Sequence, residues 1–213
     1  NIEILKAYSS AKDEYTGEAN VLLDANENSL GSPTTKWYNR YPDPYQKAVK
    51  EKIAFIKQIP ASKIFLGNGS DEVLDLLFRA FCEPGQDNII TLPPTYGMYG
   101  VLAQINNIEN REVLLSSDFQ PNAEQILEVV DACSKILFLC SPNNPSGNSF
   151  SDDTVVKLLE NFKGLVVIDE AYIDFSEKES WLNRLSDYPN LIITQTLSKA
   201  YGLAGIRLGI CYG

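Results

Sequence analysis

Apolar and polar positions alternate along this chain with two different periods. The runs at 136–140 and 165–168 contain no polar residue, which is typical of strands that are covered on both faces. Between such runs, apolar residues recur every three or four positions, which predicts amphipathic helices. We predict strands at 64–66, 88–92, 111–115, 136–140, 165–168, 191–194 and 206–212. Predicted helices lie near 71–82, 97–106, 122–132 and 152–162, and an earlier one runs from after Pro44 to about Gln58.

The order of these segments indicates the fold class. Strands alternate with helices through short connections, which is typical of an α/β fold whose sheet is mostly parallel. In such a sheet ligands bind at the carboxyl ends of the strands. The residues that follow each strand are therefore the candidates for function. Residues 1–40 precede this pattern and form a polar, irregular lead.

The composition excludes several kinds of chemistry. The 213 residues include no histidine, which excludes Ser-His-Asp and Cys-His catalysis and histidine metal sites. Any proton transfer then depends on Lys, Asp, Glu, Tyr or Cys. The 4 cysteines form no C-x-x-C pair, so we expect free thiols and no metal site.

Charge and hydropathy narrow the possible partners and the location. The chain has 18 Lys+Arg against 28 Asp+Glu, a net charge of −10, which argues against nucleic acid and anionic membranes as partners. No apolar stretch approaches the roughly 18 residues of a transmembrane helix, and the first residues lack a signal-peptide core. We therefore expect a cytoplasmic protein.

The first predicted strand leads into a turn that contains two glycines. Gly67 and Gly69 let the backbone approach a ligand closely, and the helix that begins near Ser70 and Asp71 offers free amides to a phosphate. A plain turn with a Ser or Asp helix cap explains the same residues without a ligand. Glu72 stands where G-x-G-x-x-G would need its third glycine, so the turn is not a dinucleotide fingerprint.

Three further strand ends carry candidate side chains. Tyr96 opens a helix, where its flat face suits stacking on a ring, although an aromatic residue there is more often part of the core. Asn144 lies in a proline-rich loop, which a plain Asn-Pro turn would also explain. Asp169 follows four apolar residues, so its carboxylate needs a cationic partner in partly desolvated surroundings. A structural ion pair is the alternative.

The segment after the predicted strand at 191–194 carries the remaining candidates. Lys199 is flanked by small and apolar residues, which suits a lysine that performs Schiff-base chemistry, whereas an exposed loop lysine is the plainer interpretation. Arg207 lies eight residues further on, where a cation can clamp a phosphate.

Together these motifs resemble those of the fold-type I pyridoxal-phosphate aminotransferases. The family core is matched by Ser198-Lys199-Ala-Tyr-Gly-Leu-Ala-Gly-Ile-Arg207, Asp169-Glu-Ala-Tyr172 and Asn143-Asn-Pro-Ser-Gly147. Within the family, the chain is most similar to the histidinol-phosphate aminotransferase branch, through Asp24-Ala-Asn-Glu-Asn28, Asn39-Arg-Tyr-Pro-Asp-Pro44, Gly67-x-Gly-Ser-Asp-Glu72 and Pro94-Thr-Tyr-Gly-Met-Tyr99. The resemblance spans nearly the whole chain.

The resemblance implies how pyridoxal 5′-phosphate would be held at its ring. Lys199 is implied to bind the aldehyde carbon and then to act as the base of the proton shift, a role that fits a chain without histidine. Asp169 is implied to pair with the pyridinium nitrogen. Asn144 and Tyr172 are implied to hydrogen-bond the ring's 3′-oxygen, and Tyr96 to stack on the ring face.

The resemblance also implies a phosphate site and a dimer. The 5′-phosphate would be bound by the backbone amides of Ser70 and Asp71 and by Thr196, Ser198 and Arg207. Tyr41 would reach that phosphate from the neighbouring subunit, which implies a homodimer with shared active sites. Glu72 is acidic beside a phosphate, so we interpret it as a helix-capping residue and not as a ligand.

The same resemblance implies the domain organisation. Residues 41–213 would form the cofactor-binding large domain, a three-layer α-β-α fold with a mostly parallel seven-stranded sheet. Residues 1–40 would be an N-terminal arm that belongs to the small domain and contributes to the dimer contact. Family members end in a small C-terminal domain that carries substrate-binding arginines, so we interpret the 213 residues as a fragment.

The implied reaction converts L-histidinol phosphate and 2-oxoglutarate into imidazole-acetol phosphate and glutamate, in histidine biosynthesis. Threonine-phosphate decarboxylase and other fold-type I aminotransferases share the same core and stay open as alternatives. Outside the enzymes, a non-catalytic sensor module that binds the cofactor or a phosphate is a further alternative. Regulators of that kind carry a DNA-binding domain before the core, and residues 1–40 show no helix-turn-helix pattern.

Overall fold

The structure is a computed structural model that describes residues 4–5, 21 and 24–213. The remainder of the 1–40 lead, at 1–3, 6–20 and 22–23, lies outside the described residues. Residues 1–47 form one unit and residues 48–213 another, and each is described by itself. In the first unit, the Arg40 guanidinium pairs with Glu27 at 2.8 Å, and the Tyr41 backbone N–H donates to the same carboxylate at 2.5 Å.

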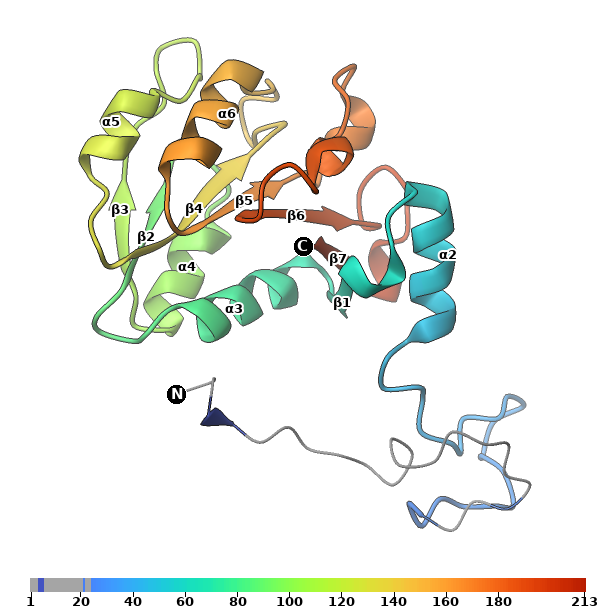
Figure 1. The fold of residues 1–213 in the computed structure, drawn as a ribbon. Helices are drawn as coiled ribbons and strands as arrows, with labels where there is room; N and C mark the ends of the chain where they lie inside the picture. Colours follow the sequence, from blue (N-terminus) through green and yellow to red (C-terminus); the bar gives the residue numbers. More distant parts are fainter. Residues whose placement is uncertain (1–3, 6–20, 22–23) are drawn as a thin grey trace. The chain divides into compact units, whose positions relative to one another are not determined.

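Residues 48–213 are built on a seven-stranded sheet with the order β1-β7-β6-β5-β4-β2-β3 (Figure 1). The strands are β1 Ile64–Asn68, β2 Asn88–Thr91, β3 Glu109–Glu112, β4 Ser134–Cys140, β5 Leu165–Asp169, β6 Leu191–Thr196 and β7 Leu208–Tyr212. Strand β7 pairs antiparallel with both β1 and β6. The pairs β2–β3, β2–β4, β4–β5 and β5–β6 are parallel. The predicted mostly parallel sheet of seven strands is therefore confirmed.

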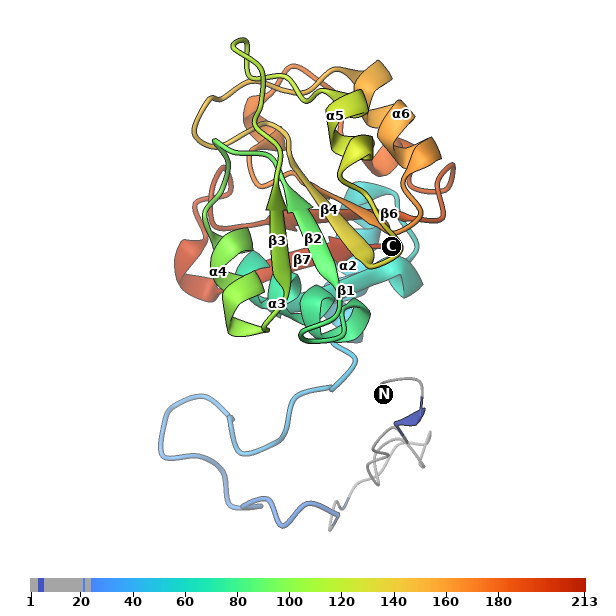
Figure 2. The same cartoon turned by 90° about the vertical axis from the view of Figure 1, so that its left-hand side faces the viewer.

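Helices cover both faces of this sheet, which confirms the three-layer arrangement (Figure 2). Helices α3 (Ser70–Phe81) and α4 (Met98–Ile105) contribute to the hydrophobic cluster on one face. Helices α2 (Lys47–Lys57), α5 (Ala123–Glu128) and α6 (Asp152–Asn161) contribute to the cluster on the other. None of the helices in the described part of the chain is long and apolar enough to span a membrane.

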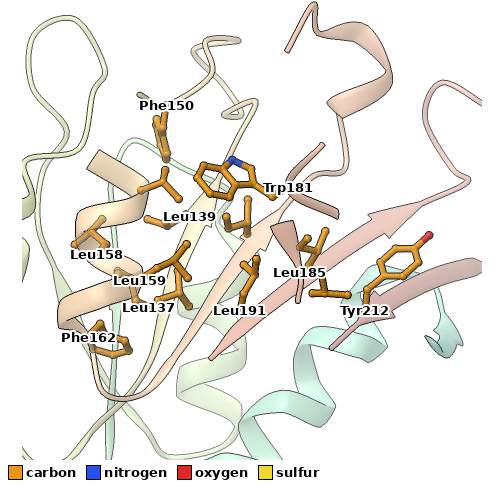
Figure 3. Packing of buried hydrophobic residues seen from close by; sticks show 14 of the residues in the cluster. Leu137, Leu139, Phe150, Leu158, Leu159, Phe162, Trp181, Leu185, Leu191 and Tyr212 are labelled. Carbon is orange, nitrogen blue, oxygen red and sulfur yellow. The ribbon is translucent and has the colours of Figure 1, made fainter. Parts of the chain in front are cut away.

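The uniformly apolar strands divide their side chains between the two clusters. In β4, Leu137 and Leu139 join the cluster that contains α6, whereas Ile136 and Phe138 join the one that contains α3 and α4. Figure 3 shows the first cluster, in which Leu137 and Leu139 of β4 lie beside Leu158 and Leu159 of α6. Full burial of each such side chain contributes about 1.5–3 kcal/mol. Successive residues of a strand face opposite sides of the sheet. A strand that is covered by helices on both faces therefore needs apolar residues at every position.

The observed strand bounds differ from the predicted ones by a few residues, and for β3 and β7 the reason can be identified. The strand predicted at 111–115 is observed at Glu109–Glu112, a polar segment on the sheet edge whose register with β2 is set by backbone pairing and not by apolar side chains. The strand predicted from 206 begins at Leu208. The residues before it form the short 3-10 helix Ala204–Ile206, and Arg207 follows in the left-handed conformation with φ 55°.

Gly164 provides a test of the packing at the start of β5. A Cβ added there would overlap the backbone carbonyl of Lys135 and the ring of Phe162. We expect Gly164→Ala to lower the free energy of unfolding of the intact protein by about 1–3 kcal/mol, the usual cost of overpacking. Urea unfolding measures this value.

Gly97→Ala is the matched control for that substitution. Gly97 is exposed, has helical backbone angles (φ −67°, ψ −18°) and has nothing within 4 Å of an added Cβ. Its variant should be as stable as the wild type or slightly more stable. Equal stability of the two variants would contradict the packing described for Gly164.

Candidate active site

The candidate side chains gather at one edge of the sheet because of its topology. Parallel strands β4, β5 and β6 bring Cys140, Asp169 and Thr194 into register. Strand β7 runs in the opposite direction, so its first residues lie at the same edge, where Leu208 pairs with Asn68 at the end of β1. The loops that leave β1, β4, β5 and β6, and the segment that enters β7, therefore meet at this edge.

The Asp169 carboxylate is a deeply buried ionisable group at this edge. Asp169 is 3% exposed and is the last residue of β5. The Tyr99 hydroxyl donates to Asp169 Oδ2 at 2.7 Å, and the Ala171 N–H donates to Oδ1 at 3.1 Å. Burial raises the pKa of Asp169, and these two hydrogen bonds act in the opposite direction. An ion pair to Asp169, the alternative left open by the sequence, is not found among the described residues.

Tyr96 lies in the same environment as Asp169, and Asp71 holds it in place. Its hydroxyl donates to Asp71 Oδ1 at 3.1 Å. Burial, together with the charge of Asp71, raises the pKa of Tyr96 to about 12, and the charge of Asp169 adds to this effect. The Tyr96 ring is therefore neutral and fixed at one edge, which leaves a ring face available for a planar ligand.

The start of α3 and the Arg207 side chain form a cradle for an anion. Gly69, with φ 83°, precedes the first helical residue, Ser70. A Cβ at Gly69 would overlap the Arg207 guanidinium, and a Cβ at Gly209 would overlap the backbone of Gly69 and Ser70. The glycines therefore allow a cation to lie against free helix amides, an arrangement that suits a phosphate group.

The predicted residue Glu72 takes no part in this cradle. It lies in the first turn of α3, and its carboxylate accepts the backbone N–H of Asn68 at 2.5 Å. Asn68 is one residue before the N-cap, Gly69. The side chain therefore stabilises the start of the helix, which agrees with the capping interpretation.

Hydroxyl groups on the segment after β6 lie next to the entry into β7. The Thr196 hydroxyl donates to the Ser198 hydroxyl at 3.0 Å, and the Ser198 N–H donates to Thr196 Oγ1 at 3.1 Å. Thr196 pairs in register with Gly209, which in turn contacts the start of α3. This contact places both hydroxyls beside the cradle.

A cavity of about 340 Å³ opens between the loop after β4 and the segment after β5. It is lined by Pro142, Asn143, Asn144, Pro145, Gly147, Tyr172, Phe175 and Ser176. The Lys199 ammonium lies 5.4 Å from the centre of the Tyr172 ring. Asn144, Tyr172 and Lys199 therefore belong to one region, and their predicted roles toward a cofactor stay predictions.

Asn143, to which we gave no separate role, holds the loop of this cavity. It accepts a hydrogen bond from the Thr95 hydroxyl at 3.0 Å and donates to the Pro94 carbonyl at 3.0 Å. The loop after β4 is thereby tied to the loop that carries Tyr96. A buried amide in a run of two asparagines is a signal that sequence reasoning could have used.

Glu170 is a second buried carboxyl that sequence reasoning did not assign. It is 1% exposed and accepts from the Ser180 hydroxyl at 2.5 Å, the Trp181 N–H at 2.7 Å and the Gln195 amide at 2.8 Å. Its side chain faces the other side of the sheet from Asp169, because the two are neighbours in an extended segment. Glu170 therefore anchors the chain around residue 180 to β6.

Tyr41 belongs to the other unit of the chain, residues 1–47. Its predicted role, in the site of a neighbouring subunit, stays a prediction. Asn144 and Tyr172 line the cavity, and Lys199 lies over the Tyr172 ring. The other predicted residues lie at the carboxyl edge of the sheet: Ser70, Asp71, Tyr96, Asp169, Thr196, Ser198 and Arg207.

The fold and this edge define an α/β protein with a phosphate cradle and a buried carboxylate, and the comparison of sequences gives its family. A sequence model of the family described as aminotransferase class I and II matches residues 13–213. The chain therefore belongs to the class I and II aminotransferases.

Relatives and solved structures are similar to this chain over most of its length. The histidinol-phosphate aminotransferases of Flavobacterium johnsoniae and Christiangramia forsetii are 69% and 62% identical to it over 100% of the chain. The chain spans about 60% of the length of each. The Sinorhizobium meliloti histidinol-phosphate aminotransferase in complex with pyridoxal-5′-phosphate has a TM-score of 0.73 and 27% identity, over 82% of this chain and 48% of that one.

The other enzyme considered above shares the fold. The L-threonine-O-3-phosphate decarboxylase of Porphyromonas gingivalis has a TM-score of 0.68 and 22% identity, over 82% of this chain and 54% of that one. At this identity the likeness shows a common fold and does not distinguish the two activities.

Glu170 gives a testable pH dependence of stability. Burial raises its pKa above the ordinary value of 4.5. As the pH rises above 4.5, the unfolded carboxyl therefore loses its proton before the folded one does, and this difference favours unfolding. We expect Glu170→Gln to remove this term, so that the variant gains stability relative to wild type between pH 4.5 and pH 7 in urea unfolding.

Glu179→Gln is the control, because Glu179 is exposed on the same segment. Its profile should follow that of the wild type. If the Glu170→Gln and wild-type profiles are parallel, the folded protein does not hold a proton on this carboxyl.

Proposed function

We propose that this protein is a pyridoxal-phosphate-dependent histidinol-phosphate aminotransferase. The reaction transfers the amino group of L-histidinol phosphate to 2-oxoglutarate and yields imidazole-acetol phosphate and glutamate. The observation that carries the proposal is the buried Asp169 carboxylate, placed at the same sheet edge as the Arg207 cradle. The substrate is supported by relatives of 69% and 62% identity that are named histidinol-phosphate aminotransferases.

The residues at the sheet edge fit the cofactor in charge and in shape. Burial raises the pKa of Asp169, and its two hydrogen-bond donors are both neutral. A cation beside the carboxylate would stabilise its ionised form, and a protonated pyridine nitrogen is such a cation. The glycines around Arg207 leave room for a phosphate against the first amides of α3. When bound, the cofactor supplies an electron sink for the carbon that loses a proton.

The side chains around the ring have separate tasks. Asp169 would hold the ring nitrogen in its protonated form, and the Tyr96 ring would stack against the cofactor. Asn144 and Tyr172 would hydrogen-bond the 3′-oxygen. Lys199 Nζ would hold the aldehyde carbon and, once free, move the proton between the two carbon atoms of the amino transfer. Lysine suits this work in a chain of 213 residues without histidine.

The phosphate would be held by charge and by backbone donors together. The contributing groups would be the backbone amides of Ser70 and Asp71, the Thr196 and Ser198 hydroxyls and the Arg207 guanidinium. A guanidinium beside helix amides supplies both a full positive charge and the partial charge of the helix terminus.

We also propose the arrangement of the larger protein. Residues 1–40 would serve as an arm within the small domain and at a dimer contact, and residues 41–213 as the cofactor-binding domain. Tyr41 would reach the phosphate of a partner subunit, so that a homodimer shares its two active sites. The net charge of −10 is consistent with small-molecule substrates and a cytoplasmic location.

The reaction is tested by assaying the intact protein with two phosphorylated substrates. With L-histidinol phosphate and 2-oxoglutarate, we expect glutamate to form in proportion to protein and cofactor. With threonine phosphate, we expect no release of CO2. The opposite result would assign the chain to the decarboxylases, and the absence of turnover with every amino donor would support a sensor module.

Lys199→Ala tests the cofactor assignment separately. We expect the intact wild type to show a visible absorption band after addition of pyridoxal phosphate and the variant to lose it, because the covalent bond to Nζ is absent. Transamination should fall by at least about a hundredfold, in the range associated with loss of an acid–base group. Lys163→Ala, at an exposed lysine before β5, is the control and should retain both.

A further inference from the structure

We propose that Tyr99 is a positioning residue that holds the Asp169 carboxylate ionised and fixed in orientation toward the cofactor's ring nitrogen. The inference rests on the proposed function, since it concerns the same site. Tyr99 lies in the first turn of α4, three residues after Tyr96, and sequence reasoning gave it no role.

The hydrogen bonds of Asp169 determine its orientation. The Tyr99 hydroxyl is 2.7 Å from Oδ2, and the Ala171 N–H is 3.1 Å from Oδ1. Each carboxylate oxygen thus has one donor from the protein, on opposite sides of the group. A carboxylate oxygen can accept more than one hydrogen bond, so capacity remains for a third donor.

The Tyr99 ring cannot readily leave this position. It is 1% exposed and stacks on Phe138, with ring centres 4.7 Å apart and an angle of 9° between the planes. Phe138 in turn stacks on Phe78 of α3 at 5.5 Å. The Tyr96 ring packs against Tyr99 at nearly a right angle, with ring centres 5.6 Å apart. An aromatic column between the sheet and the helices therefore fixes the donor to Asp169.

The electrostatics favour keeping the proton of the Tyr99–Asp169 hydrogen bond on the Tyr99 oxygen. Burial raises the pKa of Tyr99 well above its ordinary value, and the charge of Asp169 raises it further. The phenol therefore keeps its proton and acts as the donor in its hydrogen bond to Asp169. Among the side chains near Asp169, the hydroxyls of Tyr99 and Thr194 favour the ionised carboxylate, whereas the charge of Asp71 opposes it. Of the two hydroxyls, that of Tyr99 offsets more of the cost of burial.

Tyr99→Phe is the direct test, because it removes the hydroxyl and keeps the stacked ring. A hydrogen bond to a charged group contributes about 1.5–3 kcal/mol, equivalent to roughly a ten- to hundredfold change. We expect apoprotein of the intact variant to bind pyridoxal phosphate about tenfold more weakly. The pH midpoint of the bound cofactor's visible band should also shift, which a purely structural role would not cause.

Tyr212→Phe is the matched control. Tyr212 is equally buried, at 0% exposure, and its hydroxyl donates to Gln195 Oε1 at 3.4 Å on β6. We expect this variant to bind the cofactor within about twofold of wild type and to leave the pH midpoint unchanged, so any loss of stability common to removal of a buried hydroxyl is accounted for.

A double-mutant cycle establishes whether Tyr99 acts through Asp169. In an Asp169→Asn background, Tyr99→Phe should weaken cofactor binding by no more than about twofold further, because the carboxylate on which it acts is gone. A full tenfold loss in that background, or equal behaviour of the Tyr99 and Tyr212 variants, would overturn the inference.

These measurements use the cofactor without substrate. A wild type that binds pyridoxal phosphate but does not turn over histidinol phosphate would contradict the proposed reaction and leave the Tyr99 inference testable. A wild type that does not bind the cofactor would contradict both.

Discussion

The structure depends on one energetic constraint, the presence of an ionisable carboxyl at the end of an apolar strand that is covered on both faces. Asp169 follows Val166, Val167 and Ile168, each 0% exposed. Taking a carboxylate out of water costs several kcal/mol unless charge or hydrogen bonds compensate. The described residues supply two neutral donors, which offset this cost only in part. The ionised Asp169 carboxylate would therefore be stabilised by a positively charged partner, and a bound pyridinium would supply that charge.

The neighbouring carboxyl, Glu170, meets the same constraint in a different way. It points to the opposite face and is satisfied by three donors from the protein itself. One donor is the side chain of Gln195 on β6, the strand that continues into Thr196 and Ser198. The two adjacent acids thus have different environments. Glu170 is hydrogen-bonded within the protein, whereas Asp169 would remain available to the proposed cofactor.

The hydrophobic pattern predicted the sheet because strands that are buried on both faces consist of uninterrupted apolar runs. Runs such as 136–140 admit few other interpretations, whereas β3 is polar, lies on the edge and is positioned by backbone pairing alone. In the site, the strand-end rule located Asp169, Tyr96 and the Gly67–Gly69 turn. The Tyr99–Asp169 contact spans 70 positions in the sequence, so no local pattern could reveal it. The same holds for the bond from Tyr96 to Asp71, 25 positions away.

The single reversed strand explains how one edge brings together Lys199 and Arg207, the residues proposed to bind the aldehyde and the phosphate of the cofactor. In a wholly parallel sheet, the residues that enter a strand lie at the edge opposite to those that leave it. Because β7 is antiparallel to β1 and β6, the segment from Lys199 to Arg207 leaves β6 and enters β7 without crossing the sheet. Arg207 therefore meets Gly69 at the start of α3, and the contact between Gly209 and Gly69 leaves no space for a side chain. The glycines are required by this close approach, and the reversal lets one short segment carry both Lys199 and Arg207.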